Sequence, residues 1–215
     1  MNEHIRRAVN IRLVPMLLVV AVLVDGCSKS TPPGYDVAAN LATGWSQFAA
    51  ANYGSAKATF QDVLAHSSGN PEGSLGLGWA LAFLELYPDA QASFRIAAAS
   101  ADFKADAQMG LAVVYRDLPN LDSSIIYCNR LIASDSNYSF SKRPTVNYLD
   151  AHLIKAECYF RKGTPFYDSV AQELNYLSTI EGLPLLPSPG TLTPQEYEDA
   201  LLDRLQALSE ILDHT

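Results

Sequence analysis

The feature that most constrains this chain is a set of residues that returns every 34 positions. The four series with this spacing are Gly44, Gly78 and Ala112; Tyr53, Tyr87 and Leu121; Ala56, Ala90 and Ser124; and Phe60, Phe94 and Cys128. A fixed period of this length is typical of stacked helix–turn–helix units, each of which buries its apolar face only against its neighbours. The sequence therefore predicts an all-α architecture of repeated helical hairpins. Such architectures usually present a surface that holds another molecule rather than a catalytic pocket.

Four repeats cover most of the chain, and we place them at 37–70, 71–104, 105–138 and 149–182. The second helices are expected to begin at Tyr53, Tyr87, Leu121 and Tyr167. The small residues expected where two helices approach most closely are Gly44, Gly78, Ala112 and Ala156, opposite Ala56, Ala90, Ser124 and Val170. The residues expected to fill the space between units are Phe60, Phe94, Cys128 and Leu174. Glycine costs about 1 kcal/mol of helix propensity relative to alanine, so close packing is the expected compensation.

This pattern of small residue, aromatic, Ala and Phe resembles the tetratricopeptide repeat family over residues 37–180. The agreement is close in the first two repeats and looser in the last two, and the proline that commonly closes a unit is absent. The resemblance implies a right-handed α-solenoid of about four helical hairpins with a C-terminal capping helix. It also implies a noncovalent role in holding another protein, with no enzymatic activity, cofactor or small-molecule substrate.

In this family the first helix of each unit lines a concave face, and its second, fifth, ninth, twelfth and thirteenth positions project into the groove. The resemblance therefore places the only two tryptophans, Trp45 and Trp79, at the same point of adjacent units. The predicted groove consists of Leu41, Trp45, Phe48, Leu75, Trp79, Phe83, Met109, Val113, Arg116, Glu157, Phe160 and Arg161, with Asp117 beside them. This groove is apolar at one end and charged at the other. Accessible aromatic side chains are the usual anchors for an extended or helical peptide.

Two questions about the groove stay open at this point. Its side chains would be plain core if the N-terminal tether or residues 182–194 covered them. The spacing from Ala112 to Ala156 is 44 residues, so about ten are inserted, within Ser134–Asn147. Insertions in solenoids map to loops on one face and often contribute to binding, but an extended connection with no role fits the sequence equally well.

The C-terminal part carries signals of its own. Residues 182–194 contain four prolines, which excludes an α-helix there. Thr193 then supplies an N-cap, Pro194 the first helical position and Glu196 the acidic partner of a capping box. The leucine-rich stripe that follows predicts a helix to about Asp213, which shields the last repeat as capping helices of solenoids do. Binding of a partner, or self-association, is the alternative role for this helix.

The first 26 residues look like an export signal, because three arginines precede an apolar run too short to span a bilayer comfortably. Its end, Val24-Asp25-Gly26-Cys27, resembles a bacterial lipobox, although Asp25 stands where a small or aliphatic residue is usual. The resemblance implies lipidation of Cys27 and a tether over residues 27–36. We therefore expect a protein anchored to the bilayer through acylated Cys27, at the outer membrane and facing the periplasm. An ordinary cleaved signal peptide is the alternative.

The charge of the chain limits the class of partner. The formal net charge is −8, and removal of residues 1–26 takes away three arginines and two acidic residues, which leaves −9. Nucleic acid binding needs a basic face, so we expect another envelope protein or a peptide segment instead. A structural subunit of a larger outer-membrane assembly or secretion complex is the alternative function.

Other reactive chemistry is sparse in the sequence. Asp150, His152 and Cys158 belong to one predicted helix at spacings that do not share a face, so no metal site is expected. No phosphate loop or nucleophile elbow is present, and no catalytic residue is expected. Cys128 and Cys158 fall in consecutive helices and are either bridged, as an oxidising periplasm permits, or two buried thiols.

Overall fold

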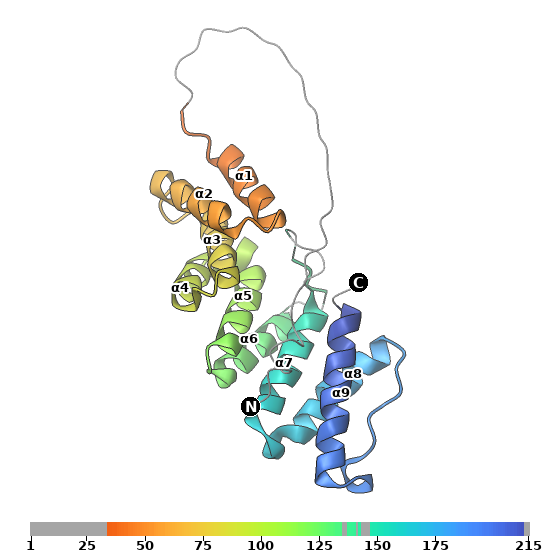
Figure 1. Cartoon of the computed structure of the whole chain (residues 1–215). Helices are drawn as coiled ribbons and strands as arrows, with labels where there is room; N and C mark the ends of the chain where they lie inside the picture. Colours follow the sequence, from red (N-terminus) through yellow and green to blue (C-terminus); the bar gives the residue numbers. More distant parts are fainter. Residues whose placement is uncertain (1–33, 135–136, 141, 143–146, 213–215) are drawn as a thin grey trace.

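A computed structural model of the chain describes residues 34–134, 137–140, 142 and 147–212 (Figure 1). Its α-helices are α1 (Val37–Ala49), α2 (Tyr53–His66), α3 (Pro71–Phe83), α4 (Tyr87–Ala97), α5 (Lys104–Asp117), α6 (Leu121–Ser134), α7 (Tyr148–Lys162), α8 (Tyr167–Ile180) and α9 (Pro194–Leu212). None of these described helices is long and apolar enough to cross a membrane. The expected export signal and Cys27 lie outside the described residues.

The described helices form consecutive hairpins that stack on one another. Each odd-numbered helix up to α7 pairs with the helix that follows it, and every pair also packs against the next pair. Figure 1 shows the pairs following one another along the molecule, with α9 beside α7 and α8 at the C-terminal end. The expected all-α solenoid is therefore confirmed.

Each expected second helix begins at the residue that the period indicates, because α2, α4, α6 and α8 start at Tyr53, Tyr87, Leu121 and Tyr167. Side chains cap several first helices. Asp36 accepts a hydrogen bond from the Ala39 N–H at the start of α1, and Asn70 does the same for Gly73 in α3. These caps satisfy backbone donors that a helix start leaves without a partner.

The turns within the first two hairpins also repeat. Ala51 and Glu85, which are 34 residues apart, both adopt positive φ, of 58° and 59°. In both turns the next N–H donates back to the first helix, Asn52 to the Gln47 carbonyl and Leu86 to the Leu81 carbonyl. The same local geometry therefore reverses the chain in both units, although neither position is a glycine.

Glycines allow the first helices to approach the large second-helix side chains. A Cβ atom built at Gly44 would lie 2.7 Å from the nearest atom of the Phe60 ring, and one built at Gly76 would lie 2.3 Å from it. One repeat further on, the Phe94 ring stands 2.7 Å from a Cβ built at Gly78 and 2.4 Å from one at Gly110. Both rings are fully buried. The expected role of Gly44 and Gly78 in close packing is confirmed, and the glycines at 76 and 110 extend it to the neighbouring unit.

The third repeat uses smaller groups at the same positions. The Ser124 hydroxyl donates to the Ala112 carbonyl at 2.7 Å, which replaces an apolar contact with a buried hydrogen bond. Cys128 and Cys158 are free and buried, so the interpretation as two thiols fits this structure. Burial raises the pKa of both, to about 11 for Cys158, and both thiols stay protonated at neutral pH.

The C-terminal segment closes the solenoid. Before α9 begins at Pro194, this segment contains only a short 3-10 turn at Pro189–Thr191, and Leu183, Leu186 and Leu192 pack against the core that α8 and α9 share, whereas Leu185 is exposed. The Thr193 N–H donates to Glu196 and the Glu196 N–H to the Thr193 hydroxyl, which confirms the expected capping box. The α9 side chains buried against α7 and α8 are Tyr197, Leu201, Leu205, Leu208 and Leu212.

The described end of the expected tether belongs to the repeats. Tyr35 stacks on His66 of α2, with ring centroids 3.7 Å apart. Asp36 is the N-cap of α1. Tyr35 and Asp36 therefore pack with the first hairpin although both precede α1.

Candidate partner-binding groove on the first helices

Most residues of the predicted groove are buried in the structure. The buried members are Leu41, Trp45, Phe48, Leu75, Trp79, Met109, Arg116, Glu157 and Phe160. Phe83 and Val113 are half-buried, and Arg161 is exposed. The two tryptophans are only 8 % and 3 % exposed, which raises the question of what covers them.

We call the segment between α6 and α7, residues 135–147, the insert. Its residue Phe140 lies against both tryptophans. Phe140 is fully buried and stacks on Trp79, with centroids 5.3 Å apart and planes at 25°. Its ring also meets Trp45 edge-on at 5.9 Å. Aromatic pairs in such stacked and edge-on arrangements are favourable beyond the area that they bury. The aromatic end of the groove is thus occupied by a side chain of the same molecule.

A charged contact fastens the insert to α3. The Lys142 ammonium lies 2.9 Å from the Glu72 carboxylate, which also accepts a 2.9 Å hydrogen bond from the Trp45 indole N–H. Lys142 is in addition 5.5 Å from the centroid of the Trp45 ring, within reach of a cation–π interaction. One carboxylate therefore orients both the groove tryptophan and the cation above it.

Asp106, in the first turn of α5, provides a second acidic contact. Burial raises the pKa of its carboxyl group to about 6, while the neighbouring Tyr138 hydroxyl and the charge of Lys142 act in the opposite direction. Tyr138 is itself buried, at 3 % exposure. The insert thus contacts the first helices of three successive repeats.

Glu72 and Asp106 were missed in the sequence analysis, although a signal for them exists. They are 34 residues apart and both occupy the second position of their repeats, one of the positions that line the groove in this type of unit. An acidic residue at the same repeat position in adjacent units is the pattern that could have indicated these two carboxylates, which we call the acidic rim of the groove.

Residues 138–140 of the insert are extended. Tyr138 and Phe140 are buried whereas Asn137 and Ser139 are exposed, which is the alternation of an extended strand. Ser139 forms an antiparallel bridge with Asn147, and the Tyr148 N–H donates to the Tyr138 carbonyl at 3.0 Å. Side chains two residues apart therefore face the groove together.

These contacts answer part of the open question about the groove. The residues found over the tryptophans belong to the insert. Leu183, Leu186 and Leu192 pack at the other end of the solenoid, and Tyr35 of the tether lies against α2. The insert is thus more than a plain connection, whereas binding of a partner in the groove stays a prediction.

The charged end of the predicted groove is an ion-pair cluster between α5 and α7. Glu157 lies between two guanidinium groups, 3.6 Å from Arg116 and 3.7 Å from Arg161, and Arg161 also donates to the Arg116 carbonyl at 2.7 Å. Burial raises the pKa of Glu157 despite both arginines. Burial tends to lower the pKa of Arg116, but Glu157 and Asp117 raise it more, so Arg116 stays charged. The cluster joins two repeats and offers little free surface.

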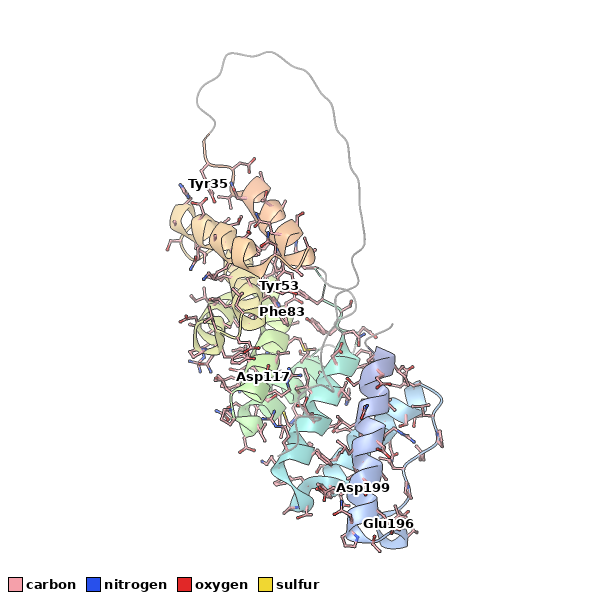
Figure 2. The ribbon with its side chains drawn as sticks, in the orientation of Figure 1. Tyr35, Tyr53, Phe83, Asp117, Glu196 and Asp199 are labelled. Atoms are coloured by element: carbon pink, nitrogen blue, oxygen red, sulfur yellow. The ribbon has the colours of Figure 1, made fainter. Side chains whose placement is uncertain are left out.

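The remaining predicted groove residues pack within the solenoid. Phe83 stacks on Tyr53 of α2 with centroids 4.6 Å apart, and Figure 2 shows the two labelled side chains lying together. Phe48 meets Phe83 edge-on at 5.3 Å. Phe160 stacks on Tyr167 at 5.5 Å and belongs to the C-terminal core. These contacts build the hairpins rather than an open surface.

Comparison with known protein families agrees with this architecture. Residues 75–139 match the family model described as tetratricopeptide repeat, a range that starts within α3, includes α4 to α6 and ends in the insert. No curated protein matches the chain. Together with the stacked helical hairpins, this match supports a tetratricopeptide repeat architecture. Repeats of this type generally bind other proteins or peptides, and the fold is typically a non-enzymatic interaction scaffold.

Proposed function

We propose that this chain is a lipid-anchored scaffold of the bacterial cell envelope that holds a partner protein, or a segment of one, on the face formed by its first helices. The observation that carries the proposal is that this face already accommodates an extended segment of polypeptide, with Phe140 between Trp45 and Trp79. The space beside these two tryptophans, which we call the aromatic slot, suits the anchor side chain of a protein ligand. Glu72 and Asp106 at its rim favour a partner that carries positive charge.

Anchoring rests on the N-terminal sequence. Acyl chains on Cys27 would stabilise membrane association by about 0.8 kcal/mol per buried CH₂, and more than one chain is needed for a stable anchor. The repeats begin at about Tyr35, so fewer than ten residues separate Cys27 from the packed body. The bound partner would therefore be held close to the membrane, at the outer membrane and in the periplasm if the signal directs the chain there.

The experiment that tests partner binding is site-specific photo-crosslinking in cells that make the full chain. A photoreactive residue at Ala38 or Ala49 probes the groove side, because these exposed residues of α1 hold the second and thirteenth positions of the first repeat. The matched control is Ile96 on the second helix α4, which is 51 % exposed. We expect a discrete crosslinked protein from the groove positions and none from Ile96. Equal labelling from all three positions, or no adduct, would contradict the proposal.

Anchoring has its own test. Wild type and Cys27→Ala are compared by membrane fractionation after labelling with a radioactive fatty acid. Lipid incorporation and membrane association are expected for the wild type and should both be lost in the variant. Membrane association without lipid incorporation would show that another feature holds the chain there.

A further inference from the structure

We infer that the insert occupies the groove in the way that a segment of the partner protein does. The groove then recognises an extended partner segment in which an aromatic residue is followed two positions later by lysine or arginine. This inference rests on the proposed function and specifies the chemistry of the partner. In the structure Phe140 and Lys142 stand in for these two residues, at Trp45, Trp79 and Glu72.

The spacing within the motif follows from the conformation of the insert. Tyr138 and Phe140 are two residues apart in an extended stretch, so they project from the same side, and Lys142 follows two positions later in the sequence. Each contacts a different part of the groove: Tyr138 the Asp106 carboxylate, Phe140 the two tryptophans, and Lys142 the Glu72 carboxylate. A partner segment that binds in the same way needs only an extended main chain and side chains at the same spacing.

The fit of the insert is incomplete, which leaves room for a better ligand. The Trp79 indole N–H is buried and has no hydrogen-bond acceptor among the described residues. A buried donor without an acceptor is costly. A partner segment that places a carbonyl or hydroxyl oxygen next to its aromatic residue would satisfy this donor, which the described residues of the insert do not.

The ionic contact of the insert contributes little to its attachment, which leaves the buried aromatic contacts to hold it. The Lys142–Glu72 pair is partly exposed, with side chains 34 % and 26 % accessible, and such pairs contribute little to stability. The connection between α6 and α7 is about ten residues longer than the 34-residue period requires, so the chain can join these helices without using the groove. Release of the insert would expose both tryptophans to a competing segment.

The test uses the full chain in detergent and a blocked synthetic peptide with the sequence of residues 137–142. Trp45 and Trp79 are the only tryptophans, so intrinsic fluorescence reports directly on the groove. Wild type is compared with Phe140→Ala, which empties the aromatic slot, and with Lys142→Ala, which removes only the exposed anchor. Ser139→Ala, at an exposed residue of the same segment, is the matched control.

We expect the peptide to bind Phe140→Ala at least tenfold more tightly than wild type, and Lys142→Ala to give an intermediate affinity. Ser139→Ala should behave as wild type, and a peptide with alanine in place of its phenylalanine should not bind. Adding Glu72→Gln to Lys142→Ala should remove the gain. If circular dichroism shows that Phe140→Ala does not fold, the comparison of Lys142→Ala with Lys142→Ala/Glu72→Gln decides the question.

Folded variants that bind the peptide no better than wild type would overturn the inference and make the insert a permanent part of the core. That result leaves the proposed function standing as long as the groove positions still crosslink a partner. Loss of crosslinking together with tight peptide binding would instead count against the proposed function alone.

Discussion

The ring of Phe60 lies directly on the backbone of Gly76, so that a Cβ at Gly76 would stand 2.3 Å from the ring. Phe60 belongs to the first repeat and Gly76 to the second. The same ring is bounded by Gly44 of its own hairpin, 2.7 Å from a Cβ placed there. Two repeats are therefore joined by one aromatic side chain that has no space to move toward either helix.

Gly76→Ala is expected to lower the free energy of unfolding. Phe60 cannot yield because Gly44 confines it, and overpacking of this kind costs about 1–3 kcal/mol. The cost exceeds the gain of up to about 1 kcal/mol in helix propensity. Urea unfolding followed by circular dichroism measures the difference. Gly54→Ala is the matched control, because a Cβ at this helical position meets nothing within 4 Å and should be neutral or stabilising.

The turn after α1 allows a second prediction. Ala51 has φ of 58°, a conformation that costs a residue with a Cβ roughly 1 kcal/mol. Ala51→Gly should therefore raise the unfolding free energy by about 0.5–1 kcal/mol. The preceding Ala50 has φ of −79°, so Ala50→Gly should destabilise by a similar amount. Opposite signs in thermal unfolding are expected, and the same sign for both variants would contradict the turn geometry.

The period predicted the hairpins well because every unit repeats the same contacts. Phe60 against Gly44 and Phe94 against Gly78 are one interaction made twice, and a pattern in the sequence is enough to find it. The place of Phe140 could not be found in this way. The insertion occurs only once among the repeats, so the 34-residue period gives no pattern from which its conformation could be predicted. The period also does not indicate on which face of the solenoid an insertion lies. The result is that most of the predicted groove residues are buried rather than open.

The rim carboxylates lead to a pH-dependent prediction. Burial raises the pKa of Asp106 to about 6 in the folded protein, above its ordinary value near 3.8. The folded state thus binds this proton more tightly, a contribution to stability that is complete below pH 3.8 and is lost as the pH rises through 6. The stability of wild type relative to Asp106→Asn should therefore fall between pH 4 and pH 6.5. Thermal unfolding of both proteins over this range measures the difference, and a constant difference would contradict the raised pKa.

The ion-pair cluster between α5 and α7 separates the effect of charge from that of packing. Glu157→Ala removes the buried carboxylate that lies 3.6 Å from Arg116 and 3.7 Å from Arg161. Loss of one partner of a buried pair typically costs about 3–5 kcal/mol, and because Asp117 still pairs with Arg116 we expect the lower end of this range.

The double variant Arg116→Met/Glu157→Leu should recover most of the stability that Glu157→Ala loses, because it removes the buried charge together with its partner and keeps similar volume. Urea unfolding of the two variants and the wild type makes the comparison. If the double variant is less stable than Glu157→Ala, the cluster is held by the geometry of its hydrogen bonds, in which the Arg116 side chain donates to Asp117 at 2.9 Å. If Glu157→Ala unfolds like the wild type, solvent reaches Arg116 and the cluster is not a buried one.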